Sequence, residues 1–84
     1  MNNQTVNTIM KFIYGWTSFP INARGIAFGV DSHGDITEIT VKGRGKSFKI
    51  AYNYGTDAFD CTDSRGTLEG LYIDQLKDYI ARAK

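Results

Sequence analysis

The chain has 84 residues, of which 42% are apolar and 13% aromatic, a composition typical of one small globular domain over 1–84. Ten Lys and Arg against nine Asp and Glu give a net charge of +1, which argues against an acidic DNA mimic and against a protein that grips many phosphates. One cysteine and one histidine exclude an internal disulfide and a Cys/His zinc site, so we expect no metal and no cofactor.

The first segment, about Asn3 to Tyr14, has the period of a helix. Its apolar residues fall on one helical face: Val6, Ile9, Met10 and Ile13. Asn2 or Asn3 can cap the start, and Gly15 is expected to end the helix. The segment lacks the basic start of a secretory signal, and nothing in the chain approaches the ~20 apolar residues that span a bilayer. With a lone cysteine, we expect a cytoplasmic protein without a membrane partner.

Four segments in the middle of the chain alternate with a period of two. They read RGIAFGVD (24–31), DITEITVK (35–42), KSFKIAYNY (46–54) and TDAFDCTD (56–63). In the first of these, Ile26, Phe28 and Val30 are expected to point to one face of a half-buried strand. The joints DSHGD, KGRGK and YGTD are short and contain glycine, which favours hairpins. We therefore predict an antiparallel meander of four strands.

The last segment, Thr67 to Lys84, is expected to be a second helix. Thr67 can cap it, and its apolar stripe comprises Leu68, Tyr72, Ile73, Leu76, Ile80 and Ala83. The element order is then α-β-β-β-β-α. The sequence predicts an α+β, two-layer sandwich in which the N- and C-terminal helices cover one face of the meander.

The stretch VKGRGKSFK, from Val41 to Lys49, contains the Gly-Lys-Ser triplet that ends a nucleotide-binding P-loop. A P-loop needs a first glycine where Thr40 stands, and a helix after the triplet. Here an alternating segment follows, so we interpret the triplet as part of a β-turn. The turn still gathers four cations, Lys42, Arg44, Lys46 and Lys49, which could contact nucleic-acid phosphates.

No catalytic or metal-binding arrangement emerges from the residue spacing. His33 is expected at a turn tip and Cys61 on the apolar face of a strand, where the two would not meet. Asp57, Asp60 and Asp63 are three residues apart, which in a strand places neighbours on opposite faces. We interpret these acids as marking strand ends and protecting an edge strand. We therefore expect no enzyme.

Two surfaces remain as candidates for binding a partner. Tyr14, Trp16 and Phe19 lie close together around the end of the first helix, and aromatic residues are favoured anchors at protein interfaces. The face of the sheet turned away from the helices carries short side chains such as Gly25, Ala27 and Gly29, which would let a second copy of the chain approach closely as a homodimer.

The expected function is that of a small non-enzymatic protein-binding domain, an inhibitor or adaptor that docks on a larger partner. Phage and mobile-element proteins that block host defence enzymes have this size and class, an analogy at the level of the fold only. The expected binding residues are Tyr14, Trp16, Phe19, Lys42, Arg44, Lys46 and Lys49. The alternative is a nucleic-acid-binding domain that contacts phosphates through the basic hairpin 42–49.

Overall fold

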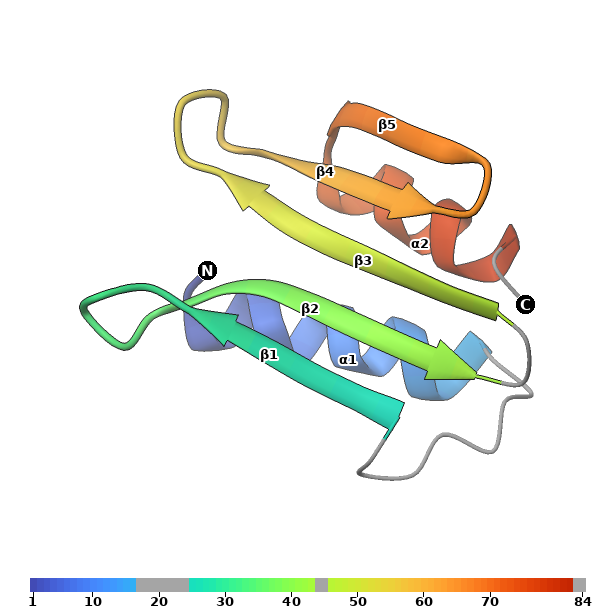
Figure 1. The fold of residues 1–84 in the computed structure, drawn as a ribbon, viewed down its shortest axis with the longest axis horizontal. Coiled ribbons are helices and arrows are strands. Elements are labelled where there is room, and N and C mark those ends of the chain that lie inside the picture. Colours follow the sequence, from blue (N-terminus) through green and yellow to red (C-terminus); the bar gives the residue numbers. More distant parts are fainter. Residues whose placement is uncertain (17–24, 44–45, 83–84) are drawn as a thin grey trace.

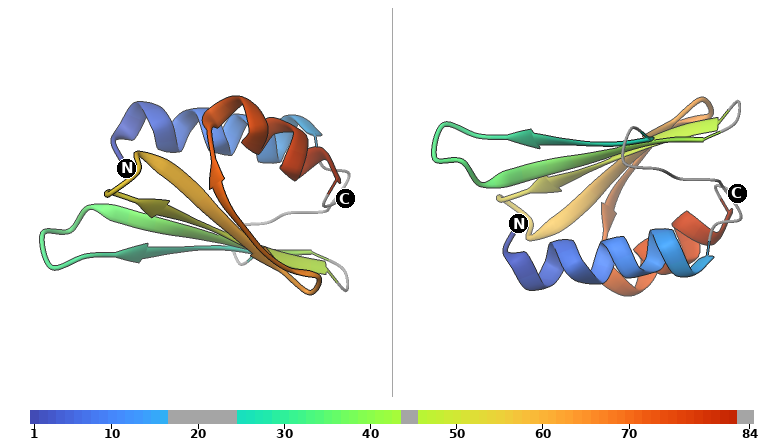
Figure 2. Two further views of the ribbon diagram at one scale, coloured as in Figure 1. Left: turned by 90° about the horizontal axis from the view of Figure 1, so that it is seen from above. Right: turned by 90° about the horizontal axis from the view of Figure 1, so that it is seen from below.

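The computed structural model describes residues 1–16, 25–43 and 46–82. These residues form seven elements: α1 (Asn3–Trp16), β1 (Ile26–Val30), β2 (Ile36–Gly43), β3 (Lys46–Asn53), β4 (Ala58–Asp63), β5 (Gly66–Leu71) and α2 (Ile73–Arg82) (Figure 1). The strands make one antiparallel sheet in the order β1-β2-β3-β4-β5. Both helices lie on one side of the sheet (Figure 2). The predicted α+β architecture is confirmed, with one strand more than expected.

Helix α1 forms for the reasons that its sequence suggests. The Asn2 side-chain oxygen accepts a 2.8 Å hydrogen bond from the Thr5 amide, which satisfies one of the orphan donors of the first turn. Val6, Ile9 and Ile13 are buried against the sheet and α2. The helix continues to Trp16, one residue beyond Gly15, where it was predicted to end.

The core lies between the helices and the inner face of the sheet. Alternate side chains of the central strands reach it, and Ile39, Val41, Ile50 and Cys61 are fully buried there. Strand β3 begins at Lys46 and pairs with β2 from Gly43↔Lys46 to Glu38↔Ala51. The residues after the Gly-Lys-Ser triplet are therefore strand, as predicted, and supply no helix dipole for a phosphate.

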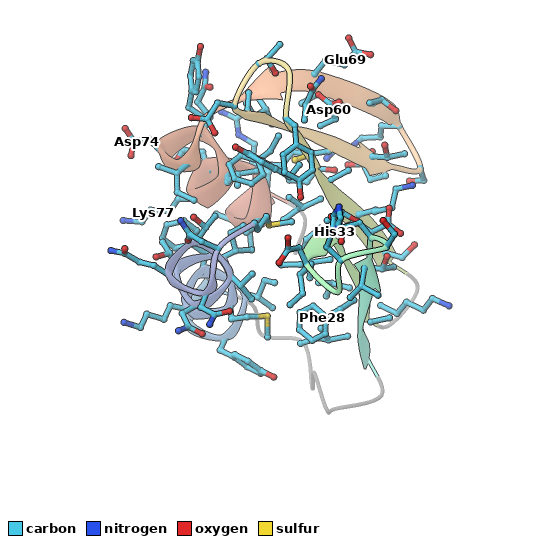
Figure 3. The ribbon with its side chains drawn as sticks, turned by 90° about the vertical axis from the view of Figure 1, so that its left-hand side faces the viewer. Phe28, His33, Asp60, Glu69, Asp74 and Lys77 are labelled. Atoms are coloured by element: carbon cyan, nitrogen blue, oxygen red, sulfur yellow. The ribbon has the colours of Figure 1, made fainter. Side chains whose placement is uncertain are left out.

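Strand β1 lies at the edge of the sheet, and its apolar side chains are only partly covered. Phe28 pairs with the fully buried Ile39, and Figure 3 shows its ring on the side of the sheet that α1 occupies. Phe28 is nevertheless 47% exposed and Val30 61% exposed. Both side chains are less covered than the apolar residues of the central strands, because an edge strand has a neighbouring strand on one side only.

The largest departure from the sequence prediction is β5. The segment Gly66–Leu71 pairs with β4 as a fifth strand, so Thr67 does not cap a helix and Leu68 is 55% exposed. Between the pairs Cys61↔Leu68 and Phe59↔Leu71, β5 has one extra residue. Gly70 absorbs this bulge with φ of 74°, and its amide donates a 3.2 Å hydrogen bond to Asp60 Oδ1. Strand β4 is therefore internal, and its acids do not protect an edge.

Helix α2 begins only at Ile73 and has its own cap. The Tyr72 carbonyl accepts the Leu76 amide at 3.0 Å, while Gln75 Oε1 accepts the Tyr72 amide at 2.8 Å. This is one half of a capping box, with Tyr72 in the cap position. Leu76, Tyr79 and Ile80 are buried. Among the described helices, none has the length and apolar character to cross a bilayer.

Candidate functional site

The aromatic and basic residues predicted to bind a partner do not form one surface. Tyr14 is 57% exposed on α1, in the helical layer. Lys42 and Lys49 are exposed on the opposite side of the molecule, on the sheet face turned away from the helices, which we call the outer face. The remaining predicted residues lie outside the described part of the chain, either entirely or in their side chains: Trp16, Phe19, Arg44 and Lys46.

Polar side chains cover parts of the outer face where the sequence suggested only short side chains. Gly29 pairs with Glu38, and a Cβ atom at Gly29 would collide with Cγ of Glu38. The glutamate side chain therefore lies over the glycine. Further along the face, the hydroxyls of Thr62 and Thr67 are 3.0 Å apart in a cross-strand hydrogen bond. The small residues of this face thus give space to neighbouring polar side chains.

An open hollow of about 700 Å³ lies at the end of the molecule where α1 and α2 begin. Tyr52, Tyr54 and Tyr72 line it together with Asp35 and Asp57, and we call it the tyrosine pocket. These residues come from the β1–β2 turn, the end of β3 with the turn that follows, and the residue that caps α2. Figure 3 looks onto this end of the molecule, with His33 and Asp74 labelled.

Aromatic rings form one wall of the tyrosine pocket. The Tyr52 ring lies edge-on to Tyr54, with centroids 4.6 Å apart at 75°, and tilted against Phe59 at 5.4 Å. These are favourable arrangements of ring quadrupoles. Phe59 is buried and Tyr52 half-buried, whereas Tyr54 is 60% and Tyr72 62% exposed. The packed rings thus run from the buried Phe59 out to Tyr54, and Tyr72 is a second tyrosine of the lining that projects into solvent.

Carboxylates surround these rings. The Tyr52 hydroxyl donates a hydrogen bond to Asp57 Oδ1, and this bond raises the pKa of Tyr52 above its ordinary value. The pKa of Tyr54 is raised by loss of hydration and by the charges of Asp31 and Asp35. Asp31 is fixed by its own turn, because its Oδ1 accepts the amides of His33 and Asp35. The phenols therefore stay neutral next to fixed negative charge.

A second hollow, of about 480 Å³, lies between β5 and α2. Leu68 and Leu71 form its apolar part, and Arg65 and Arg82 lie among its polar residues. Arg65 forms an ion pair within the protein, in which its Nη2 lies 2.8 Å from Asp63 Oδ2. Asp63 and Asp78 also line this hollow, so its two acids and two cations present no single sign of charge to a ligand.

The residues considered for catalysis are kept apart. His33 is exposed in the β1–β2 turn (Figure 3), whereas Cys61 is fully buried on the inner face. Burial, together with the charges of Asp60 and Asp63, raises the pKa of the Cys61 thiol to about 12. Within the residues that the structure describes, His, Cys, Asp and Glu side chains form no group of three that could hold a metal ion.

Comparison with protein-family models, with curated proteins and with solved structures gave no match to this chain.

The sequence interpretation missed the tyrosine pocket. Tyr52 and Tyr54 were assigned only to the alternating strand, and Tyr72 to the stripe of the last helix. A signal was present in YNYGTD, where two tyrosines alternate directly before a turn that contains an aspartate. Sequence spacing alone could not show that this segment lies next to Tyr72 and Asp35, because those residues are distant in sequence.

Proposed function

We propose that this chain is a small, non-enzymatic protein-binding domain that docks on a larger partner through the tyrosine pocket, as an inhibitor or adaptor does. The observation that carries the proposal is the exposure of Tyr54 and Tyr72, at 60% and 62%, on the rim of an open hollow of about 700 Å³. Exposed aromatic residues grouped at a hollow are favoured anchors of protein interfaces, because each buries a large area for little loss of side-chain freedom.

The packing of the wall supports this choice of site. Tyr52 is held by the ring of Phe59 and by its hydrogen bond to Asp57, so the base of the wall is already ordered. Ordered anchor residues lower the entropy cost of association. The analogy with phage and mobile-element inhibitors and the cytoplasmic location remain part of the proposal, on the grounds of size and the lone cysteine.

The test uses the tagged chain as bait in extract of the cells from which it comes, with quantitative mass spectrometry. The variants are the double substitution Tyr54→Ala with Tyr72→Ala, and Tyr14→Ala as the matched control. Tyr14 is equally exposed, at 57%, but lies on α1 away from the pocket lining. A partner retained by wild type and by Tyr14→Ala, and lost with the double variant, supports the proposal. Retention by the double variant with loss in Tyr14→Ala would move the interface to the end of α1.

Nucleic-acid binding is the second candidate, and one observation favours it. Lys42 and Lys49 are both exposed on the outer face of adjacent strands, where a phosphate backbone could reach them together. The double substitution Lys42→Ala with Lys49→Ala should then abolish binding to mixed DNA and RNA at low salt. Undetectable binding by the wild-type chain under those conditions removes this candidate.

A further inference from the structure

We propose that the tyrosine pocket receives a cationic side chain, arginine or lysine, from a basic segment of the partner protein. This inference rests on the proposed function and deepens it by naming the chemistry of the docked segment. It is carried by the combination, in one hollow, of two projecting tyrosine rings with the carboxylates of Asp35 and Asp57, the latter hydrogen-bonded to Tyr52. Each feature alone is common on protein surfaces, and together they match a cation on two counts.

The first count is charge. Asp35 and Asp57 line the pocket, and Asp31 lies near enough to Tyr54 to act on its hydroxyl. The positive group in the lining is the α-ammonium of Met1, which donates a 2.6 Å hydrogen bond to the carbonyl of Ile36. The two carboxylates of the lining, against one ammonium, leave the lining net negative, and the nearby Asp31 adds to that charge. A basic segment would therefore be attracted and an acidic one repelled.

The helix starts at this end do not reverse that preference. Helix N-termini attract anions through unsatisfied amides. Here the chain satisfies part of that demand itself, since Asn2 Oδ1 accepts the Thr5 amide in α1 and Gln75 Oε1 accepts the Tyr72 amide at the start of α2. Asp74, in the first turn of α2 and outside the pocket lining, offsets part of the positive potential at that helix end. The two helix starts therefore offer an anion fewer free amides than uncapped helices would.

The second count is the aromatic wall. A cation over a tyrosine face within about 6 Å of the centroid is attracted by the ring quadrupole, and guanidinium groups also stack on it. The Tyr52 ring packs against the rings of Tyr54 and Phe59 within the protein. Tyr54 and Tyr72 project outward and are the rings available to a partner. An arginine between them and the carboxylates would gain ring contacts and charge-assisted hydrogen bonds together.

The test is a titration of the isotopically labelled chain, followed by amide NMR, with short end-capped peptides of glycine and serine that carry arginine, lysine, glutamine or glutamate. We expect saturable shifts of the Tyr54 and Tyr72 amides with the arginine and lysine peptides, weakened by added salt, and none with the other two. Tyr54→Ala and Asp35→Asn should each weaken binding by about threefold to tenfold. Leu68→Ala, at a residue that is 55% exposed on β5 and outside the pocket lining, should leave it unchanged.

Three results would overturn the inference. Equal shifts with the glutamine peptide would show that charge plays no part in binding. The proposed function would still stand in that case if a protein partner is captured through the pocket. An absence of shifts with the arginine and lysine peptides, or shifts confined to other amides, would show that the pocket does not receive a cation. Pocket shifts that depend on the concentration of the chain alone would show that a second copy covers the pocket.

Discussion

The hydroxyl of Tyr79 on α2 donates a 3.0 Å hydrogen bond to Oδ2 of Asp63 at the end of β4. The same oxygen accepts Arg65 Nη2 at 2.8 Å, and Oδ1 accepts the Arg65 amide at 2.8 Å. Tyr79 also packs its ring edge-on against Phe48, with centroids 5.9 Å apart. One carboxylate thus joins the second helix to the β4–β5 hairpin, outside the lining of the tyrosine pocket.

Removal of the Tyr79 hydroxyl should destabilise the fold modestly. Tyr79→Phe keeps the buried ring but deletes the hydrogen bond to Asp63, which is worth about 1 kcal/mol of unfolding free energy. Urea denaturation with an unchanged m-value measures the loss. Tyr14→Phe is the matched control, because Tyr14 is 57% exposed on α1. Equal midpoints for wild type and Tyr79→Phe would contradict the role assigned to this bond.

The Asp63 carboxylate should make stability depend on acid pH. The Arg65 side chain, with the Arg65 amide and Tyr79 in addition, lowers the pKa of Asp63 from 3.8 to about 2. A carboxyl with a lowered folded-state pKa contributes stability that is present above its unfolded value and lost as pH falls through the folded one. The stability gap between wild type and Asp63→Asn should therefore be constant above about pH 5 and close towards pH 2.

Thermal unfolding of both proteins across this pH range measures that gap. Glu69→Gln serves as the control, because Glu69 is exposed on β5 and leaves the Asp63 contacts intact. A gap that persists unchanged at pH 2 would show that Asp63 stabilises the fold through its shape rather than its charge. Because Arg65 is 67% exposed in this ion pair, solvent screening keeps the effect small.

Two leucines that the sequence assigned to one helical stripe should behave differently. Leu76 is fully buried on α2, so Leu76→Ala removes apolar contacts and leaves a cavity, at a cost of about 3 kcal/mol. Leu68 is 55% exposed on β5, so Leu68→Ala should change the unfolding free energy by less than about 0.5 kcal/mol. Urea titrations of both variants measure this. Similar losses would favour a helix through residue 68 over the strand.

The predicted and observed folds differ at β5 for a physical reason. The first four strands could be predicted because apolar residues recur at every second position of the sequence, as Phe48, Ile50 and Tyr52 do in β3. In TLEGLY, Leu68 and Tyr72 have the helical spacing of four, and this local pattern hid the strand. Two features outweigh it: the left-handed Gly70, and the hydrogen-bonding edge that β4 offers.

The tyrosine pocket was beyond sequence prediction for a different reason. Its residues come from segments as far apart as Asp35 and Tyr72, and the strand order of the sheet brings them to one end. The alternation of hydrophobic residues predicts which side chains face the core, but it does not predict which turns become neighbours. Tyr72 reaches the pocket only because β5 delays the start of α2 to Ile73.

Cys61 should react with alkylating reagents only when the chain unfolds. The thiol is fully buried, and its pKa is raised to about 12, so the nucleophilic thiolate is scarce at pH 8. Alkylation by iodoacetamide, followed by intact mass, reports this site directly because it is the only cysteine in the chain. We expect slow labelling in buffer and rapid labelling in urea. Rapid labelling of the native protein would contradict the burial of Cys61.

A destabilised variant connects this labelling rate to the unfolding equilibrium. If the thiol reacts only from the open state, the native rate equals the open fraction multiplied by the rate for a free thiol. Leu76→Ala, at a cost of about 3 kcal/mol, should then accelerate labelling by roughly a hundredfold at the same pH. Leu68→Ala should leave the rate almost unchanged. If both variants label at the wild-type rate, Cys61 is reached by a local motion of β4 rather than by global unfolding.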